Sequence, residues 1–296
     1  MQPDWQQEIN QQLGGNYAWR PFAKGSSNTL YLGQPPEPQC SDSDKTNSHH
    51  DNSNHRDHDN PQAVILRLNA PTHLTPGVDR QREAALLRLI KSQNWAPNII
   101  KNNVNDGWCA MTLYHAMTTE QPLSAPLTSQ LIKAVSELQK ITTKKPLSKQ
   151  LTTALTVDYN VLWETTYVPQ ATARHDQITL DLIDEIKQNL RELPLVPTCL
   201  VHHDLHLGNL VLKPCDQHSS ATQDQLIILD WEYGGLGNPW LDAAALANFF
   251  KIPARTIATL PAFHYLDPCT FEQGLVKAFD IRDLINKLWY RARGEI

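Results

Sequence analysis

The sequence lacks the features that would place it among secreted, membrane or nucleic-acid-binding proteins. Its five scattered cysteines form no Cys-x-x-Cys pair, and an odd number without a framework indicates reduced thiols. The net charge of −5 comes without a long basic run, which gives no reason to expect a nucleic-acid partner. Neither a signal peptide nor an apolar run of about 18–20 residues is present. We therefore expect a cytoplasmic protein without a membrane partner.

The length and the apolar content are those of an ordinary folded protein. The 296 residues suffice for one large domain or two smaller lobes with a sizeable core, and 41% of them are hydrophobic.

The first third of the chain has the pattern of a β-sheet with one helix. Pro76-Gly77-Val78-Asp79 opens the helix, which has Glu83 in an early turn and an apolar stripe further on. Runs of β-branched and aromatic residues predict the strands. These predicted strand regions are 16–24, 30–32, 63–69, 98–102 and 108–114.

Residues 34–61 interrupt this pattern, because they are polar, rich in Pro, Ser, Asp and His, and almost free of apolar side chains. Such a segment buries too little surface to order itself, so we expect a flexible surface insertion. It carries four histidines that would bind a divalent metal loosely, although a solvated loop is the simpler interpretation. They are His49, His50, His55 and His58.

From about residue 117 the periodicity is helical. Helices are expected at 131–141, 178–190, 243–250 and 271–289, with two short strands at 210–212 and 226–229. The sequence therefore predicts an α+β protein, with an antiparallel sheet and one helix in residues 1–116 and a mostly helical part in residues 117–296.

Two acidic motifs carry the chemical information. The first is His202-x-Asp204-x-x-x-x-Asn209, and the second, Asp230-Trp-Glu232, follows a predicted hairpin. Phosphoryl transfer from ATP needs one carboxylate that orients a hydroxyl, together with an Asn and an Asp that hold Mg²⁺ against the phosphates. The pair of motifs in this order matches that requirement.

In these motifs the chain resembles the superfamily of aminoglycoside phosphotransferases and choline kinases, over residues 17 to about 250. The resemblance implies a protein-kinase-like fold of two lobes, with ATP and Mg²⁺ as cofactors. It implies that Asp204 is the catalytic carboxylate, that His202 supports the catalytic loop, and that Asn209 and Asp230 bind the metal. The simpler alternatives are a solvated Asp204 and an Asn209 that only completes the turn after Gly208.

The resemblance also assigns a nucleotide site in the first lobe. Gly25, Ser26, Ser27 and Asn28 would cover the phosphates, although any hairpin turn has such a composition. Ile65 would cover the adenine, and Arg67 would contact phosphate and pair with Glu83. Arg67 departs from the Lys of the wider kinase fold, and Glu83 has a solvated helix charge as its alternative. Backbone groups around Leu113 and His115 would meet the adenine edge.

The acceptor is less well defined. The run after Asp230 looks more like thiamine and choline kinases than like antibiotic-resistance enzymes, which favours a small cationic metabolite: thiamine first, choline or ethanolamine second. Carboxylates and aromatic faces would bind such a cation. The candidates are Glu232, Tyr233, Trp240, Trp163 and Tyr167, with ordinary core packing as the alternative for both tryptophans. Asp242 either braces the catalytic loop or caps a helix.

Three other functions remain open at this point. A catalytically silent binding protein of the same fold would lack Asp204, Asn209 or Asp230, yet all three are present. A metallohydrolase would use His202, His203 and His206 as metal ligands, and an aminoglycoside phosphotransferase would differ only in its acceptor. A protein kinase is disfavoured, because Asp-Trp-Glu replaces Asp-Phe-Gly and no Ala-Pro-Glu element follows. The oligomeric state is not indicated.

Overall fold

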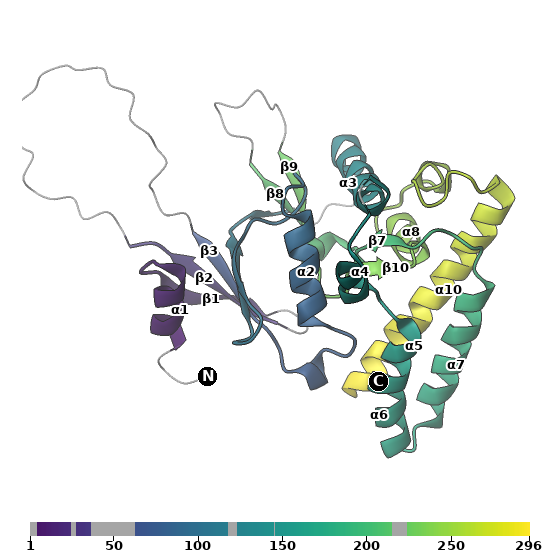
Figure 1. The fold of residues 1–296 in the computed structure, drawn as a ribbon, viewed down its shortest axis with the longest axis horizontal. Coiled ribbons are helices and arrows are strands. Elements are labelled where there is room, and N and C mark those ends of the chain that lie inside the picture. The colour runs from purple at the N-terminus through teal and green to yellow at the C-terminus, as the bar shows by residue number, and fades with distance from the viewer. Residues whose placement is uncertain (1–4, 25–27, 37–62, 118–122, 145, 215–223) are drawn as a thin grey trace, which may run out of the picture. The chain divides into compact units, whose positions relative to one another are not determined.

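The computed structural model describes residues 5–24, 28–36, 63–117, 123–144, 146–214 and 224–296 (Figure 1). Residues 37–62, with all four histidines of the predicted insertion, lie outside the described residues. The chain divides into one unit of Met1–Ala70 and Asn98–Leu113 and a second of Pro71–Pro97 and Tyr114–Ile296. The predicted helix after Asp79 thus clusters with the second unit, and a lobe boundary near residue 116 stays a prediction.

The first unit is built on an antiparallel sheet with the strand order β1-β2-β3-β5-β4. Its strands are β1 (Ala18–Lys24), β2 (Thr29–Gln34), β3 (Val64–Leu68), β4 (Ile99–Asn103) and β5 (Trp108–Thr112). The central strand β3 is buried from Val64 to Arg67. Helix α1 (Trp5–Leu13) places Ile9 in a core with Val64 and Leu66. Because side chains alternate along a strand, Ile65 and Arg67 lie on the opposite face, as the sequence predicts.

The second unit contains most of the helices of the described chain. Their bounds are α2 (Arg80–Ile90), α3 (Ala125–Lys144), α4 (Lys149–Leu155), α5 (Tyr159–Leu162), a π-helix (Trp163–Tyr167), α6 (Val168–Ala173), α7 (Gln177–Glu192), α8 (Trp240–Asn248), α9 (Ala254–Ile257) and α10 (Pro268–Arg293). Its strands are β6 (His115–Ala116), β7 (Cys199–Val201), β8 (Leu210–Lys213), β9 (Gln225–Ile228) and β10 (Gly235–Gly237). Helix α10 lies beside both α7 and α8 (Figure 1).

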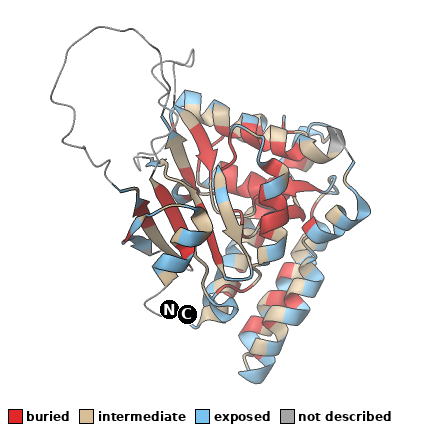
Figure 2. Ribbon diagram, turned by 60° about the vertical axis from the view of Figure 1, so that its left-hand side comes forward, coloured by how far each residue is buried: buried red, intermediate tan, exposed pale blue. Residues whose placement is uncertain are grey.

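Helix α8 forms the centre of the second unit's core. All residues from Trp240 to Leu246 are buried, which Figure 2 shows as a red helix among red strands. The Trp240 ring lies 4.6 Å from that of Phe263 and 5.4 Å from that of Phe271. Gly274 of α10 lets this ring approach, because a Cβ there would come within 2.4 Å of it. Only glycine permits such contact without a shift of one helix.

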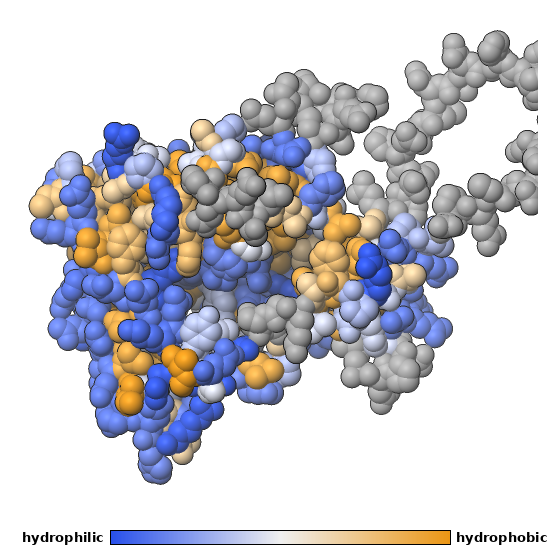
Figure 3. Space-filling model, turned by 180° about the vertical axis from the view of Figure 1, so that it is seen from behind, coloured by the Kyte–Doolittle hydropathy of each residue, from blue (hydrophilic) through white to orange (hydrophobic). Residues whose placement is uncertain are grey.

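Large apolar side chains such as Ile178, Leu195 and Val276 are exposed on separate elements. On the face drawn in Figure 3, apolar residues form short strips between polar ones. Within the described chain, no helix combines the length and the apolar composition that a membrane crossing requires.

The predicted α+β class, with an antiparallel sheet in the N-terminal part and a helical C-terminal part, is confirmed. Asp79 accepts hydrogen bonds from the backbone N–H groups of Gln81 and Arg82, so α2 begins where the sequence places it. Helix α1 was missed, although Trp5, Ile9 and Leu13 recur at helical spacing. The short helices between 149 and 173 were also missed, because their apolar faces are too brief to show a clear period.

Candidate active site

The loop between β7 and β8 carries the first motif. It leaves β7 at Val201, passes through a 3₁₀ turn at Leu207–Asn209 and enters β8 at Leu210. His203 has a φ of 68°, and Asp230, after the second strand of the hairpin, has a φ of 59°. Non-glycine residues adopt this left-handed region at a cost of about 1–3 kcal/mol, so surrounding contacts must hold both backbones in place.

Asp242 provides such contacts for the loop. Its two carboxylate oxygens accept hydrogen bonds from the backbone N–H groups of His202 and His203, each at 2.8 Å, and the residue is 1% exposed. The N-cap of α8 is Pro239, so Asp242 lies within the first turn and does not cap the helix. Of the two interpretations, bracing of the catalytic loop is the one that the geometry supports.

His202 is buried beneath this loop as a neutral imidazole. Its Nε2 donates to the Leu229 carbonyl at 2.8 Å, while its Nδ1 accepts from the Asp204 N–H at 3.2 Å. A proton on Nδ1 would face the Asp204 N–H and break the second bond. Burial lowers the pKa of His202, against the attraction of Asp242 and Asp204. His202 therefore ties the Asp204 backbone to the segment that leads to Asp230.

His203 is held by a residue that the sequence did not single out, Tyr159 of α5. The Tyr159 hydroxyl lies 2.8 Å from His203 Nε2 and accepts from the Asn238 N–H at 2.9 Å. His203 Nδ1 bonds the Tyr233 carbonyl at 3.1 Å. Because Tyr159 lies 44 residues from His203, no local pattern could have revealed this contact.

The interpretation of the three histidines as a transition-metal site is wrong. His202, His203 and His206 each bond a different set of partners, and His206 Nδ1 accepts from the Gly208 N–H. In the part of the chain that the structure describes, no three His, Cys, Asp or Glu side chains gather as a metal site. The described residues therefore give no support to a metallohydrolase built on these histidines.

Asp204 and Asn209 lie against each other at the open end of the loop. The Asn209 amide nitrogen donates to the Asp204 carbonyl at 2.8 Å and to its Oδ2 at 3.2 Å. His206 Nε2 lies 3.6 Å from the same oxygen. Burial alone would raise the pKa of Asp204, but His206, His202 and Asn209 outweigh it and hold that pKa below its usual range. Asp204 is thus a carboxylate at neutral pH, with 35% of its side chain exposed.

The donor set of Asn209 and Asp230 suits Mg²⁺. The hairpin aligns the two residues, since Leu210 pairs with Ile228 and the Leu229 N–H donates to the Asn209 carbonyl at 2.8 Å. The Asn209 amide nitrogen is occupied by Asp204, which leaves the amide oxygen as the atom for a cation. An amide oxygen and a carboxylate are hard ligands of the kind that Mg²⁺ prefers.

Glu83 and Glu232 are joined by Arg80, which the sequence did not single out. Arg80 Nη1 donates to Glu83 at 3.1 Å and to Glu232 at 2.8 Å. The two glutamates are 2% and 3% exposed, so Glu83 is not a solvated helix charge. The ion pair also turns Glu232 toward α2 and away from solvent, which contradicts a role for Glu232 in direct acceptor binding.

Both tryptophans of the predicted acceptor site are core residues. Trp240 is 0% exposed and donates its indole N–H to the Pro194 carbonyl, while Trp163 is 2% exposed and packs between Tyr159 and Tyr167. Core packing, the alternative for both residues, is the interpretation that this burial favours, because a ring with no accessible face cannot meet a ligand. The Tyr233 hydroxyl accepts from Trp289, and burial raises the pKa of Tyr233.

The predicted nucleotide residues fall on several parts of the chain. Gly25, Ser26 and Ser27 lie outside the described residues. Asn28 is buried, and its side-chain oxygen accepts from the Ala70 N–H at 3.2 Å. Ile65 and Arg67 are buried in β3; Leu113 donates its N–H to the Ala63 carbonyl, and His115 is exposed. Their nucleotide contacts, and the pairing of Arg67 with Glu83, stay predictions.

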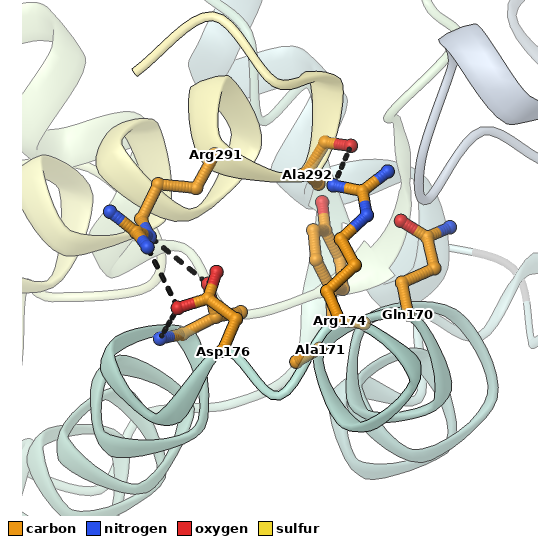
Figure 4. A pocket seen from close by; sticks show the side chains of 8 residues that line it. Gln170, Ala171, Arg174, Asp176, Arg291 and Ala292 are labelled. Atoms are coloured by element: carbon orange, nitrogen blue, oxygen red, sulfur yellow. Dashed lines mark hydrogen bonds and ion pairs between the residues drawn. The ribbon is translucent and has the colours of Figure 1, made fainter.

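A small cavity lies between α6, α7 and the end of α10 (Figure 4). Arg291 crosses it to Asp176 at 2.7 Å, and Arg174 donates to the Ala292 carbonyl at 3.4 Å. Its volume of about 10 Å³ is close to what one water molecule needs. Tyr167 lines it, but the space is too small for a metabolite.

The neutral state of His202 predicts a dependence of stability on pH. Above about pH 6.5, His202 is neutral in both the folded and the unfolded state. Below this pH, His202 binds a proton in the unfolded chain but stays neutral in the folded protein. The free energy of unfolding should therefore fall on acidification. In His202→Gln the slope between pH 7 and 5.5 should flatten by up to about 1.4 kcal/mol per pH unit.

Urea unfolding at several pH values measures this slope. The exposed His73 offers a matched control, because His73→Gln makes the same substitution at a side chain in contact with solvent. Equal slopes for wild type and His202→Gln would show that His202 takes up a proton as readily in the folded protein as in the unfolded chain.

Known proteins resemble this chain in sequence pattern and in fold. Residues 46–267 match the model of the phosphotransferase enzyme family. The sequence matches no curated protein. Among solved structures, the chain is similar to an ethanolamine kinase from Plasmodium vivax, with a TM-score of 0.65, 15% identity, and coverage of 94% of this chain and 77% of that chain.

Two further solved structures are also similar to this chain. The choline kinase LicA from Streptococcus pneumoniae has a TM-score of 0.58 at 16% identity, covering 98% of this chain and 91% of that chain. The phosphotransferase APH(2″)-IIa, solved as a gentamicin complex, has a TM-score of 0.61 at 15% identity, covering 100% and 95%. At such identities the likeness establishes the kinase-like fold alone. The family match spans most of the sequence, and the chain belongs to the phosphotransferase enzyme family.

Proposed function

We propose that the protein transfers the γ-phosphoryl group of ATP to a hydroxyl of a small metabolite. The observation that carries the proposal is the contact between Asp204 and Asn209, in which the amide nitrogen fixes the carboxylate and its own oxygen stays available for a cation. A carboxylate beside an amide oxygen, next to the Asp230 strand end, is the arrangement that this transfer needs.

Each residue of the loop has a role in the proposed reaction. Asp204 orients the acceptor hydroxyl and takes its proton as the bond to phosphorus forms, and its lowered pKa keeps it ionised for this task. Asn209 and Asp230 would hold Mg²⁺, which supplies neutralisation of the phosphate charge when bound. Asp242 and His202 fix the loop backbone, so that Asp204 needs little rearrangement in the transition state.

Nucleotide binding is supported by relatives of the same fold. A spectinomycin phosphotransferase, with a TM-score of 0.56 at 13% identity, was solved with ADP and spectinomycin. For this chain, Asn28, Ile65, Arg67 and the Leu113–His115 segment are the proposed nucleotide contacts. A silent binding protein is the second candidate, but no position of the catalytic motifs has lost its functional group.

The acceptor is proposed to be a small molecule, and the relatives suggest which ones to test. Thiamine remains our first candidate and choline or ethanolamine the second, because the run after Asp230 resembles those kinases. Glu232, Trp163 and Trp240 no longer support this choice, since they are buried. Aminoglycosides belong in the same screen. A cytoplasmic location remains a prediction.

The test is an ATP-consumption screen of the full chain with Mg²⁺ against thiamine, choline, ethanolamine and aminoglycosides, with hydroxy acids as a further set. We expect acceptor-dependent ADP release that stops on chelation of Mg²⁺ and in Asp230→Ala. If ATP binds but no acceptor raises ADP release above the rate in water, the silent binding protein is favoured instead.

A further inference from the structure

Arg282 of α10 is a partly buried cation whose guanidinium group packs on an aromatic ring. Its guanidinium carbon lies 4.1 Å from the centre of the Phe249 ring, just beyond α8. Its Nη1 is shielded from solvent and has no hydrogen-bond partner within the described residues. Burial lowers the pKa of Arg282, against the attraction of Asp204 and Asp242. Shielding a guanidinium N–H group from water without a partner is costly, so a structural role alone explains the position of Nη1 poorly.

The surroundings of Arg282 connect it to the catalytic carboxylate. Phe249, over which it lies, has its ring 6.5 Å from that of His206, and His206 lies 3.6 Å from Asp204. Asp204 and His206 keep 35% and 39% of their side chains exposed. These four side chains, Asp204, His206, Phe249 and Arg282, form what we call the acceptor patch. Any hydroxyl that Asp204 orients must enter beside it.

The contact with Phe249 does not use the N–H donors of Arg282. A guanidinium over an aromatic ring offers one face to the ring, while its N–H donors point outward in the plane. That planar fork matches the two oxygens of a carboxylate or phosphate. The stacking on Phe249 also restricts the side chain, so less rotamer entropy is lost when an anion binds.

We propose that Arg282 binds an oxyanion group, a carboxylate or a phosphate, carried by the same small molecule whose hydroxyl Asp204 orients. The inference rests on the proposed function, and it places hydroxy acids or phosphorylated alcohols ahead of thiamine, choline and ethanolamine as acceptors. Arg282 is then the specificity-determining residue of the acceptor patch, because it compensates the negative charge that an acidic acceptor brings toward Asp204.

The experiment compares pairs of acceptors that differ by one oxyanion group. Ethanolamine is compared with serine, choline with carnitine, and glycerol with glycerate and glycerol 3-phosphate, all in the ATP-consumption assay with Mg²⁺. The wild type should have a kcat/KM at least about ten times higher for one acidic member than for its uncharged or cationic counterpart. Glycerate and glycerol 3-phosphate separate a carboxylate from a phosphate.

Variants of Arg282 then test whether this residue causes the preference for the acidic acceptor. Arg282→Met should raise KM for the preferred acidic acceptor about 10- to 100-fold, with a much smaller change for the uncharged partner. Arg282→Lys should recover part of the loss, because it restores the charge without the fork. Lys287→Met, which removes a positive charge from the exposed side of the same helix, should leave both values unchanged.

Three results would overturn the inference. Turnover of cationic acceptors with none for the acidic ones rejects the role of Arg282 and leaves the proposed function intact. An equal fall of kcat for all acceptors in Arg282→Met, at unchanged KM, assigns the residue to packing alone. Absence of turnover with every acceptor rejects the proposed function and this inference with it. The wild-type comparison does not depend on whether a variant folds.

Discussion

Replacement of Asp204 by alanine is expected to lower the rate of phosphoryl transfer by about 10²–10⁴-fold, the range in which a positioned proton acceptor acts. Asp204 is the ionised carboxylate at the open end of the loop, and its Oδ2 already receives the Asn209 amide. Binding of Mg²⁺ and ATP should largely survive, because Asn209 and Asp230 remain. Single-turnover kinetics with a productive acceptor, together with ATP titration, measure the two quantities.

The surface residue Asp280 provides a control for this variant. It is an exposed carboxylate on α10, so Asp280→Ala removes the same charge without touching the loop and should retain full turnover. Turnover of Asp204→Ala within a few-fold of the wild type, with its true acceptor, would refute the catalytic assignment.

Replacement of Asp242 by alanine is expected to lower the free energy of unfolding by roughly 3 kcal/mol or more. The substitution leaves the backbone N–H groups of His202 and His203 buried without their acceptor, and it releases a backbone that His203 holds at positive φ. Because both effects act on the segment next to Asp204, phosphoryl transfer should fall as well. Urea unfolding at neutral pH measures the change.

Asp242→Asn distinguishes the hydrogen bonds from the charge. Its amide oxygen can still accept one N–H, while its amide nitrogen faces the other, so we expect an intermediate loss of stability. The exposed Asp184→Ala should lie within about 0.5 kcal/mol of the wild type. A loss below about 1 kcal/mol for Asp242→Ala would mean that the loop is held mainly by other contacts.

The structure changes the predicted acceptor site chiefly at the residues that it shows to be buried. Trp163, Trp240 and Glu232 look like a cation site in a linear sequence, because aromatic rings together with a carboxylate are the groups that bind cations. In the fold, Trp163 and Trp240 pack in the core and Glu232 pairs with Arg80. Aromatic residues serve cores as readily as ligand sites, and only the surrounding elements distinguish the two uses.

Other residues are absent from the predicted site, because their partners lie far away in the sequence. Tyr159 reaches His203 across 44 residues and Arg80 reaches Glu232 across 152 residues, so no spacing rule could have revealed these two contacts. Arg282 likewise meets Phe249 from a different helix. Helix α1 is different, since its apolar spacing was visible in the sequence.

By itself, the sequence determined the α+β class, most of the longer helices and strands, and the chemistry of the two acidic motifs. These features depend on local periodicity and on fixed spacings within a few residues. Only the tertiary structure decided the state and partners of each side chain: the neutral His202, the brace from Asp242, the buried Glu83 and Glu232, and the stacked Arg282. Burial and hydrogen bonding across distant elements set these properties, and they arise when the chain is folded.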